Sequence, residues 1–507
     1  MVRRVGTVNR PAIHRTRPLV STVAGRLRSQ RRDVGASGRS GRVGFWGRSA
    51  ATARIQSGMA PASGIGPDPS WLISRAASAH ADVVHPDQAG PMSEALRTPS
   101  TATPPAIQVL PDAPRTPRSM RRIFALEDLE PAARRRLPPP IFGYVAGGAE
   151  TNASLNDNRR VFDEIQFLPR MLVGVSGRTL ECRLMAKDYA LPFGIAPMGV
   201  TALTGYRGDL SLAKSASRAG IPMIISAASL IPLEEIAAAA PGVWYQAYLS
   251  GDQDETSALI ARVVRAGIDT FVITADSAVV PSRENNLRTG YRTPIRPNAG
   301  LLWNGITHPI WSLGTFLRTF LQHGNPHFEN AGPGRGAPLL SMQATRDFSG
   351  REFLDWDIVR FVRAHWQGRL VIKGLLHPSD VAMAREVGAD GVILSNHGGR
   401  QLDGAISPMR ALPAAIQQAG DMAIMIDSGF RRGTDILKAV GLGAQFVFIG
   451  RPFNYASALG GEVGVDHAIG LLRTQLRADL GMLGLLSLNE MNRDVLFLNS
   501  FKAVRQR

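Results

Sequence analysis

The chain has 507 residues, of which 44% are hydrophobic and 20% are charged, so it can bury a sizeable core as a soluble protein. Its single cysteine, Cys182, excludes an internal disulfide and a cysteine zinc cage, and we expect no metal site. The sequence contains no apolar run of about 18 or more residues, so we predict no transmembrane helix. The net charge of +17 would favour nucleic acid or an anionic membrane as a partner if the basic residues were spread along the chain.

Most of that charge lies in residues 1–119, which hold 17 arginines and 6 acidic residues, a net charge of +11. This segment is rich in Ser, Gly, Ala and Pro and lacks helical or strand periodicity, so we predict a disordered basic extension. It could be a targeting peptide, a nucleic-acid-binding tail or the product of a misassigned start codon. We favour the last, and expect no nucleic-acid binding, because amphipathic sequence begins directly after Met120. The folded domain is therefore predicted at residues 120–507.

Beyond Leu180, short apolar runs rich in β-branched residues alternate with helical patterns. Continuous apolar runs of this length are typical of buried parallel strands. The predicted strands are residues 191–197, 221–226, 243–249, 269–276, 369–374, 391–396, 422–429 and 444–450. Eight such units predict an α/β protein with a closed (β/α)₈ TIM barrel, and a doubly wound open sheet is the alternative.

Residues 277–368 separate the fourth and fifth predicted strands, a spacing much longer than a usual strand-to-helix connection, so we predict an inserted functional loop. Its middle, residues 301–327, contains two tryptophans and two more large aromatics, Phe316 and Phe320, with no acidic residue. This composition favours a helix lying in a membrane interface, and a cap over the barrel mouth is the alternative. We expect a cytoplasmic protein that can lie on the surface of the inner membrane.

Active sites of such barrels lie at the C-terminal ends of the strands. Every predicted strand from the second onward ends in a polar residue or in a glycine that would suit a phosphate. These residues are Ser226, Gln246, Tyr248, Thr274, Asp276, Lys373, Ser395, His397, Asp427, Gly450 and Arg451. One polar strand end could be a helix cap, but one after each of seven strands indicates an active site.

The last two strands are followed by "DSGFRRGTD" and "GRPF". Phosphate sites of these barrels lie at this point, where backbone N–H groups and a helix N-terminus meet the anion. Gly429, Gly433 and Gly450 allow close approach of the backbone, while Arg431 and Arg451 can add charge-assisted hydrogen bonds. The sequence therefore predicts a phosphorylated ligand or cofactor.

The stretch "SNHGGRQLD", residues 395–403, places His397 before two glycines and close to Arg400. Arg400 could bind a substrate carboxylate beside a base at His397, and Asp276 could orient the imidazole. Lys373 could stabilise an anion formed during reaction or could form a structural ion pair.

The string "SNHGGRQ" resembles the signature around the catalytic histidine of the FMN-dependent α-hydroxy acid dehydrogenase and oxidase family. The resemblance runs from about Ile123 to the C-terminus and is greatest to the bacterial membrane-associated L-lactate and (S)-mandelate dehydrogenases. It includes "YVAGGAE", "IAPMG", "YQAY", "ITAD", "VIKG", "DSGFRRGTD" and "IGRP", all in family order.

The resemblance implies a role for each matching residue. His397 would remove a proton from a 2-hydroxy acid, either from Cα or from the hydroxyl during hydride transfer to flavin N5. Asp276 would stabilise the protonated imidazole, and Lys373 the negative charge of the reduced flavin. The catalytic set implied is His397, Asp276, Tyr248 and Lys373, and the substrate-binding set is Tyr144, Tyr248, Arg283, His397 and Arg400. The implied FMN-binding residues are Ala196, Pro197, Met198, Gly199, Ser226, Gln246, Thr274, Lys373, Ser395, Asp427, Ser428, Gly429, Arg431, Gly450 and Arg451.

By this resemblance the protein oxidises an L-2-hydroxy acid to the 2-oxo acid, with L-lactate as the first expectation and mandelate as the second. Gly199 stands where oxygen-using members often have alanine, and residues 301–327 resemble the long loop of membrane-associated members. Both features favour a quinone or respiratory-chain acceptor, and an H₂O₂-producing oxidase is the alternative. Ala227 and Ala228 follow Ser226 where plant oxidases carry an aromatic residue, so a different substrate side chain could fit. The resemblance also implies a homotetramer.

Overall fold

The computed structural model describes residues 118–296, 298–343 and 350–504, so the predicted N-terminal extension lies outside the described residues except for its last two. Eight parallel strands form one sheet whose order follows the chain. They are β4 (Phe193–Ile195), β5 (Ile224–Ser226), β6 (Trp244–Ala247), β7 (Thr270–Thr274), β8 (Arg369–Leu375), β9 (Gly391–Leu394), β10 (Ala423–Ile426) and β11 (Phe446–Ile449). A hydrogen bond of 2.9 Å from Ile195 N–H to the Pro222 carbonyl closes the barrel between β4 and β5. The predicted TIM barrel is confirmed.

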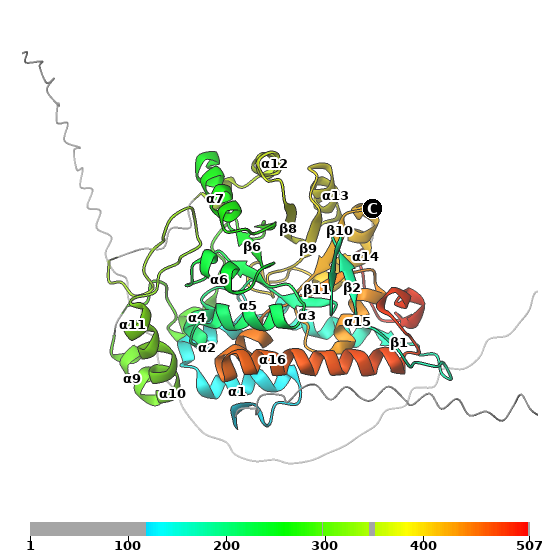
Figure 1. Ribbon diagram of the computed structural model, residues 1–507, viewed down its shortest axis with the longest axis horizontal. Helices are drawn as coiled ribbons and strands as arrows, with labels where there is room; N and C mark the ends of the chain where they lie inside the picture. The colour runs from blue at the N-terminus through cyan, green and yellow to red at the C-terminus, as the bar shows by residue number, and fades with distance from the viewer. Residues whose placement is uncertain (1–117, 297, 344–349, 505–507) are drawn as a thin grey trace, which may run out of the picture. The chain divides into compact units, whose positions relative to one another are not determined.

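Helices follow the strands and cover the outside of the barrel (Figure 1). They are α4 (Thr201–Thr204), α5 (Gly208–Arg218), α6 (Leu233–Ala239), α7 (Gln253–Arg265), α12 (Trp356–His365), α13 (Pro378–Glu386), α14 (Pro408–Ala419), α15 (Gly433–Gly441) and α16 (Arg451–Met482). Helix α7 shows why they form. Asp252 caps its first N–H groups, and Leu259, Ile260 and Val263 make one buried face. Helix α16 is broken at Gly461, whose φ of 55° is outside the helical region.

The inside of the barrel is filled by large side chains that alternate along the strands, among them Trp244, Phe446 and Phe448. A hairpin of β2 (Cys182–Leu184) and β3 (Lys187–Tyr189) packs against this interior, with the Tyr189 ring centroid 5.5 Å from that of Phe446. Arg369 Nε, at the start of β8, donates a hydrogen bond of 3.0 Å to the carbonyl of Met185 in the hairpin turn. The hairpin therefore plugs the N-terminal end of the barrel.

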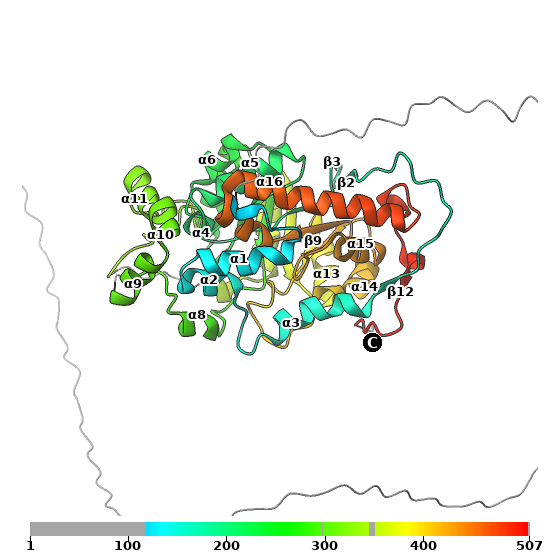
Figure 2. The same cartoon turned by 90° about the horizontal axis from the view of Figure 1, so that it is seen from below.

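Three helices precede the barrel: α1 (Leu129–Arg136), α2 (Pro139–Ala146) and α3 (Ala153–Arg160). Helix α1 packs beside α16 (Figure 2). The end of α2 reaches the C-terminal end of the barrel, where Arg451 Nε donates a hydrogen bond of 2.9 Å to the carbonyl of Val145. Near the other end of the domain, β12 (Leu496–Phe497) pairs with β1 (Gln166–Phe167). Helix α2 thus forms part of the rim around the open barrel mouth.

The insert after β7 contains α8 (Glu284–Thr289), α9 (Ala299–Thr307), α10 (Pro309–Trp311), a π-helical turn (Ser312–Leu317) and α11 (Arg318–His323), and α9 to α11 project from the barrel (Figure 1). The prediction of one helix over this segment is wrong. Pro309 lacks an N–H, and His308 before it has φ −124° and ψ 60°, so the helix is broken there. No helix in the described part of the chain is long and apolar enough to cross a membrane.

The insert has one attached face and one exposed face. Trp311 is 3% exposed and its Nε1 donates a hydrogen bond of 2.8 Å to the carbonyl of Leu203 in α4. Along α9, α10, the π-helical turn and α11, six large apolar side chains are between 62% and 77% exposed: Leu302, Trp303, Ile306, Ile310, Leu313 and Leu321. The two tryptophans of this segment therefore differ in environment, since Trp311 fixes the insert to the barrel while Trp303 is exposed.

Candidate active site

A cavity of about 480 Å³ opens at the C-terminal ends of the barrel strands, a volume suited to a cofactor or small ligand. Its lining comes from strand-end loops, the end of α2, both ends of the insert and the beginning of α16. The lining cations are Arg283, Arg292, Arg351, Lys373, Arg400, Arg431 and Arg451, against one carboxylate, Asp427, among the described lining residues. This excess of positive charge favours an anionic ligand.

His397 and Asp276 form a hydrogen-bonded pair in this cavity, with 2.9 Å between His397 Nδ1 and Asp276 Oδ1. Asp276 follows β7 and His397 follows β9, so the barrel brings together residues that are far apart in the sequence. His397 has a left-handed φ of 56°, and Gly398 and Gly399 continue that conformation. The hydroxyl of Ser395 fixes this turn by accepting a hydrogen bond of 2.9 Å from the His397 N–H.

The charges of this pair suit a base. Burial lowers the pKa of His397 below its ordinary value, and the nearby Asp276 offsets only part of that effect, so the imidazole is neutral at pH 7. Burial opposes the charge of Asp276, but His397 and Lys373 hold the pKa of this carboxyl below its usual value. With Nδ1–H donated to the carboxylate, Nε2 of His397 keeps a lone pair that can accept a proton.

Lys373 and Asp427 form a second, deeper pair. Lys373 Nζ lies 2.9 Å from Asp427 Oδ2, with side chains only 4% and 9% exposed, and it donates a hydrogen bond of 2.8 Å to the hydroxyl of Ser395. Burial disfavours the ammonium, but Asp427 and Asp276 more than compensate and raise the pKa of Lys373. The cavity therefore contains a fixed cation. The structural ion pair expected for Lys373 is present, and its role toward an anion formed during reaction stays a prediction.

The loops after β10 and β11 form a cationic cradle. Ser428 and Gly429 have φ values of 79° and 93°, and a Cβ at position 429 would collide with the backbone of Asn158, so only glycine fits there. Burial, together with Arg451, lowers the pKa of Arg431 to about 10, which leaves it charged at pH 7. With the N-terminus of α16, this cradle suits a phosphate.

Arg451 has a second use that its position in "GRPF" did not reveal. Its guanidinium donates hydrogen bonds to the carbonyls of Val145 (2.9 Å), Gly398 (2.9 Å) and Gly147 (3.1 Å). It therefore ties the end of α2 to the loop that carries His397, and acts as a structural tie in addition to lining the cavity.

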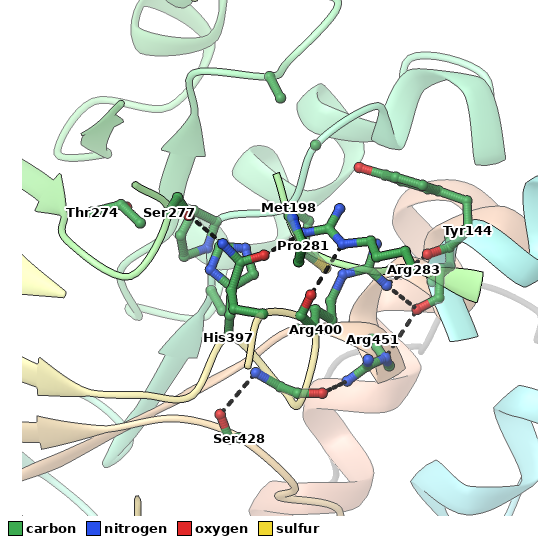
Figure 3. Close-up of a pocket in the computed structure, with 18 of the residues that line it drawn as sticks. Tyr144, Met198, Thr274, Ser277, Pro281, Arg283, His397, Arg400, Ser428 and Arg451 are labelled. Atoms are coloured by element: carbon green, nitrogen blue, oxygen red, sulfur yellow. Dashed lines mark hydrogen bonds between the residues drawn. The ribbon is translucent and has the colours of Figure 1, made fainter. Parts of the chain in front are cut away.

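Arg283 and Arg400 lie next to one another in the cavity, close to His397 (Figure 3). Arg283 Nε donates a hydrogen bond of 3.1 Å to the Arg400 carbonyl, and Arg400 Nη1 donates one of 2.6 Å to the Tyr144 carbonyl. Neither pairs with a carboxylate among the described residues. Burial and the neighbouring Arg283 lower the pKa of Arg400 to about 9, so a bound carboxylate would relieve an unfavourable pair of like charges.

The sequence model of the FMN-dependent dehydrogenase family matches residues 133–498. The chain belongs to the FMN-dependent 2-hydroxy acid dehydrogenases. It is 36% identical over 377 residues to (S)-mandelate dehydrogenase of Pseudomonas putida, covering 74% of this chain and 94% of that protein. It is also 36% identical over 380 residues to L-lactate dehydrogenase of Pseudomonas entomophila, covering 74% and 98%. The crystal structure of the monotopic membrane protein (S)-mandelate dehydrogenase matches with a TM-score of 0.67 and 35% identity, covering 75% of this chain and 100% of that one.

The cavity of this dehydrogenase fits FMN. Gln246 Nε2 and Thr274 Oγ1 line it, are buried, and have no hydrogen-bond partner within the described part of the chain. An unsatisfied buried polar group costs about 1–3 kcal/mol, so such groups call for a ligand partner. A flavin ring offers suitable donors and acceptors to this end of the cavity, and the phosphate suits the cradle at Ser428, Gly429 and Arg431. The predicted cofactor is confirmed by the family.

Most of the predicted site residues of the dehydrogenase line the cavity. They are Tyr144, Ala196, Pro197, Met198, Gly199, Gln246, Tyr248, Thr274, Arg283, Lys373, His397, Arg400, Asp427, Ser428, Gly429, Arg431, Gly450 and Arg451. Three others lie directly behind that lining. Asp276 contacts His397, Ser395 contacts Lys373, and the hydroxyl of Ser226 donates a hydrogen bond of 3.3 Å to Gln246 Oε1. These three residues therefore contact the lining residues without lining the cavity themselves.

The sequence did not reveal several lining residues. Tyr291 stacks on Tyr144 with ring centroids 4.3 Å apart, and Arg351 lies over the ring of Tyr248. Both belong to the insert and follow no strand end, so the strand-end rule could not find them. Asn454, on α16, lines the cavity with a buried amide oxygen that has no partner among the described residues. The sequence signal for Asn454 is its place as a polar residue inside the apolar run "PFNYA".

The pKa of His397 predicts the pH dependence of the dehydrogenase. As a base, His397 would act in its neutral form, so we expect kcat/KM to fall as the pH falls through the pKa of His397, with a midpoint below its ordinary value of 6.5. Asp276→Asn removes an interaction that raises this pKa, so it should move the midpoint lower still. A pH series of kcat/KM measures both effects. A wild-type midpoint above 6.5, or an upward shift in the variant, would contradict the assignment of the base.

Proposed function

We propose that the enzyme oxidises L-lactate to pyruvate and passes the electrons to a quinone or another respiratory-chain acceptor. The observation that carries this proposal is the convergence of a neutral histidine, paired with Asp276, and two guanidinium groups in one cavity that fits FMN. Oxidation of a 2-hydroxy acid to the 2-oxo acid removes two electrons and two protons, one from Cα and one from the hydroxyl, next to a carboxylate that must be bound. The cavity offers a matching group for each requirement.

In this proposal Arg283 and Arg400 bind the substrate carboxylate with charge-assisted hydrogen bonds, and Tyr144 assists them. Tyr248 donates a hydrogen bond to the reacting hydroxyl. Nε2 of His397 accepts the proton, either from Cα or from the hydroxyl, and Asp276 then stabilises the imidazolium.

FMN, when bound, is the two-electron acceptor of the reaction. Lys373 supplies a fixed positive charge at the bottom of the cavity, where negative charge develops as the substrate is oxidised. Its partner Asp427 and the hydroxyl of Ser395 hold the ammonium in place.

(S)-Mandelate is the second candidate substrate, because Val279, Val280, Leu287 and the small Ala228 form an apolar part of the cavity wall. Relatives that act on lactate and on mandelate are equally similar to this chain. In this proposal the methyl group of lactate leaves part of the apolar wall uncovered, whereas the phenyl group of mandelate covers more of it. The two substrates are therefore separated by measurement of kcat/KM for each.

The deciding experiment is an anaerobic titration of the yellow holoenzyme with L-lactate, (S)-mandelate and their mirror images. Bleaching of the visible absorbance by an L-2-hydroxy acid is expected, and its absence with every L-2-hydroxy acid would overturn the proposed function. Reoxidation is then compared between a quinone analogue and O₂. Faster reoxidation by O₂ would identify the H₂O₂-producing oxidase instead.

We also propose that the enzyme binds a membrane surface through α9, α10 and α11. Six exposed apolar side chains share this region, and the similar (S)-mandelate dehydrogenase is described as a monotopic membrane protein. This placement brings a lipid-soluble acceptor close to the insert, whose first residues line the cavity. By its resemblance to the family we further propose a homotetramer.

The triple variant Leu302→Glu, Ile306→Glu and Ile310→Glu should weaken binding to anionic lipid vesicles by about 100-fold or more, since three large apolar side chains leave the membrane. Vesicle co-sedimentation measures the effect. Val264→Glu is the matched control, because Val264 is 57% exposed but lies on α7, away from α9, α10 and α11 (Figure 1). Unchanged co-sedimentation of the triple variant would reject this face as the membrane contact.

A further inference from the structure

The returning end of the insert is fixed against the loop that follows β6. The N–H of Gly251 donates a hydrogen bond of 3.2 Å to the carbonyl of Gly350, and the side chain of Phe353 lies so close to Gly251 that a Cβ there would be 2.7 Å from it. Tyr248 lies on the same loop, three residues before Gly251. This attachment places Arg351 directly beside Tyr248.

Arg351 lies face-on to the phenol ring, with 4.1 Å between the guanidinium carbon and the ring centroid of Tyr248. Both side chains line the cavity and are half-buried. A cation at this distance from an aromatic face is attracted by the electron density of the ring, and the attraction grows as water is excluded. The stacking restricts the ring, while its hydroxyl has no hydrogen-bond partner among the described residues and stays available to the substrate.

The same cation acts on the acidity of the phenol. Burial raises the pKa of Tyr248, and the nearby carboxylate of Asp276 adds to this effect, whereas Arg351 and Arg283 oppose it. A more acidic phenol is a stronger hydrogen-bond donor. The arginine therefore counters the environment that would otherwise weaken the tyrosine as a donor.

We propose that Arg351 is a positioning residue that holds the Tyr248 ring by a cation–π contact and strengthens its hydroxyl as a donor to the reacting hydroxyl of the substrate. This inference rests on the proposed function and adds a contribution of the insert to the reaction. The competing role is direct binding of the substrate by the guanidinium, and the two roles differ in whether they need the hydroxyl of Tyr248.

A double-mutant cycle separates these roles. Arg351→Gln should lower kcat/KM by about tenfold, mainly through kcat, because the cation–π contact and its polarisation of the donor are lost. Arg351→Lys keeps a cation and should retain most of the activity. Phe at position 248 keeps the ring but lacks the hydroxyl, so in the Tyr248→Phe background Arg351→Gln should change kcat/KM by about twofold or less. The matched control is Arg288→Gln, an exposed arginine on α8 paired with Glu284, which should behave as the wild type.

An equal loss from Arg351→Gln in both backgrounds would overturn the proposal, as would no loss in the Tyr248-containing enzyme. If Arg351→Gln does not retain FMN, Arg351→Lys is compared with Arg351→Ala instead. A kcat/KM of Arg351→Lys no higher than that of Arg351→Ala would also overturn the proposal. Wild-type enzyme that turns over no L-2-hydroxy acid in the same assay would reject the proposed function and this inference together. Normal wild-type turnover with an additive cycle would reject only the role of Arg351.

Discussion

Replacing His397 with glutamine is expected to lower the rate of substrate oxidation by about 10²–10⁴-fold, the contribution of a well-placed general base. Glutamine can keep a hydrogen bond to Asp276, but it has no basic nitrogen and cannot accept a proton at the position of Nε2. The residues of the cationic cradle and the Lys373–Asp427 pair do not depend on the imidazole. The variant should therefore still bind FMN.

The measurement is the single-turnover rate of bleaching under anaerobic conditions, together with the FMN content of the purified variant. The matched control is His377→Gln, because His377 only caps α13 by accepting a hydrogen bond of 3.2 Å from the Ser379 N–H. A loss of less than about tenfold in the His397 variant would show that another group is the base.

Replacing Lys373 with methionine is expected to destabilise the protein by about 3–5 kcal/mol, because it leaves the carboxylate of Asp427 buried without its cation. Because methionine fills a similar volume, the loss of unfolding free energy reports the removal of the charge and not the creation of a cavity. The variant should also bind FMN more weakly, since the positive charge at the bottom of the cavity is gone. Urea unfolding and titration of the apoprotein with FMN measure the two losses.

Two further variants show whether the ion pair is the cause. Lys438→Met removes a half-buried lysine whose Nζ donates one hydrogen bond of 2.8 Å to the Phe162 carbonyl, and it should lose only about 0.5–1.5 kcal/mol. Lys373→Met combined with Asp427→Leu removes both charges and should recover much of the stability without recovering activity. Equal losses from the two lysine variants would contradict the importance of the pair.

The barrel and most of its rim could be predicted because two physical rules act on the sequence directly. Parallel strands buried on both faces appear as continuous apolar runs, and the residues after them meet at one end of the barrel. This is why Asp276 and His397, 121 residues apart, could be expected to meet. The family resemblance added Tyr144 and Arg283, which follow no strand directly.

The contribution of the insert could not be predicted in the same way. Tyr291 and Arg351 reach the cavity because the loop folds back onto the barrel, and tertiary contacts such as Gly251 with Gly350 decide where they lie. Local sequence has no periodicity that records such contacts. For the same reason the carbonyl partners of Arg451 and the attachment of Trp311 to the barrel appear only in the structure.

The hairpin of β2 and β3 has a consequence for the order of events during turnover. Because the hairpin fills the N-terminal end of the barrel, the cavity opens at the C-terminal end, at the rim formed by α2 and the insert. Under the proposed function, the hydroxy acid would enter and the oxo acid would leave at this rim. An electron acceptor that approaches by the same rim could follow only after the oxo acid has left, so the two half-reactions would alternate.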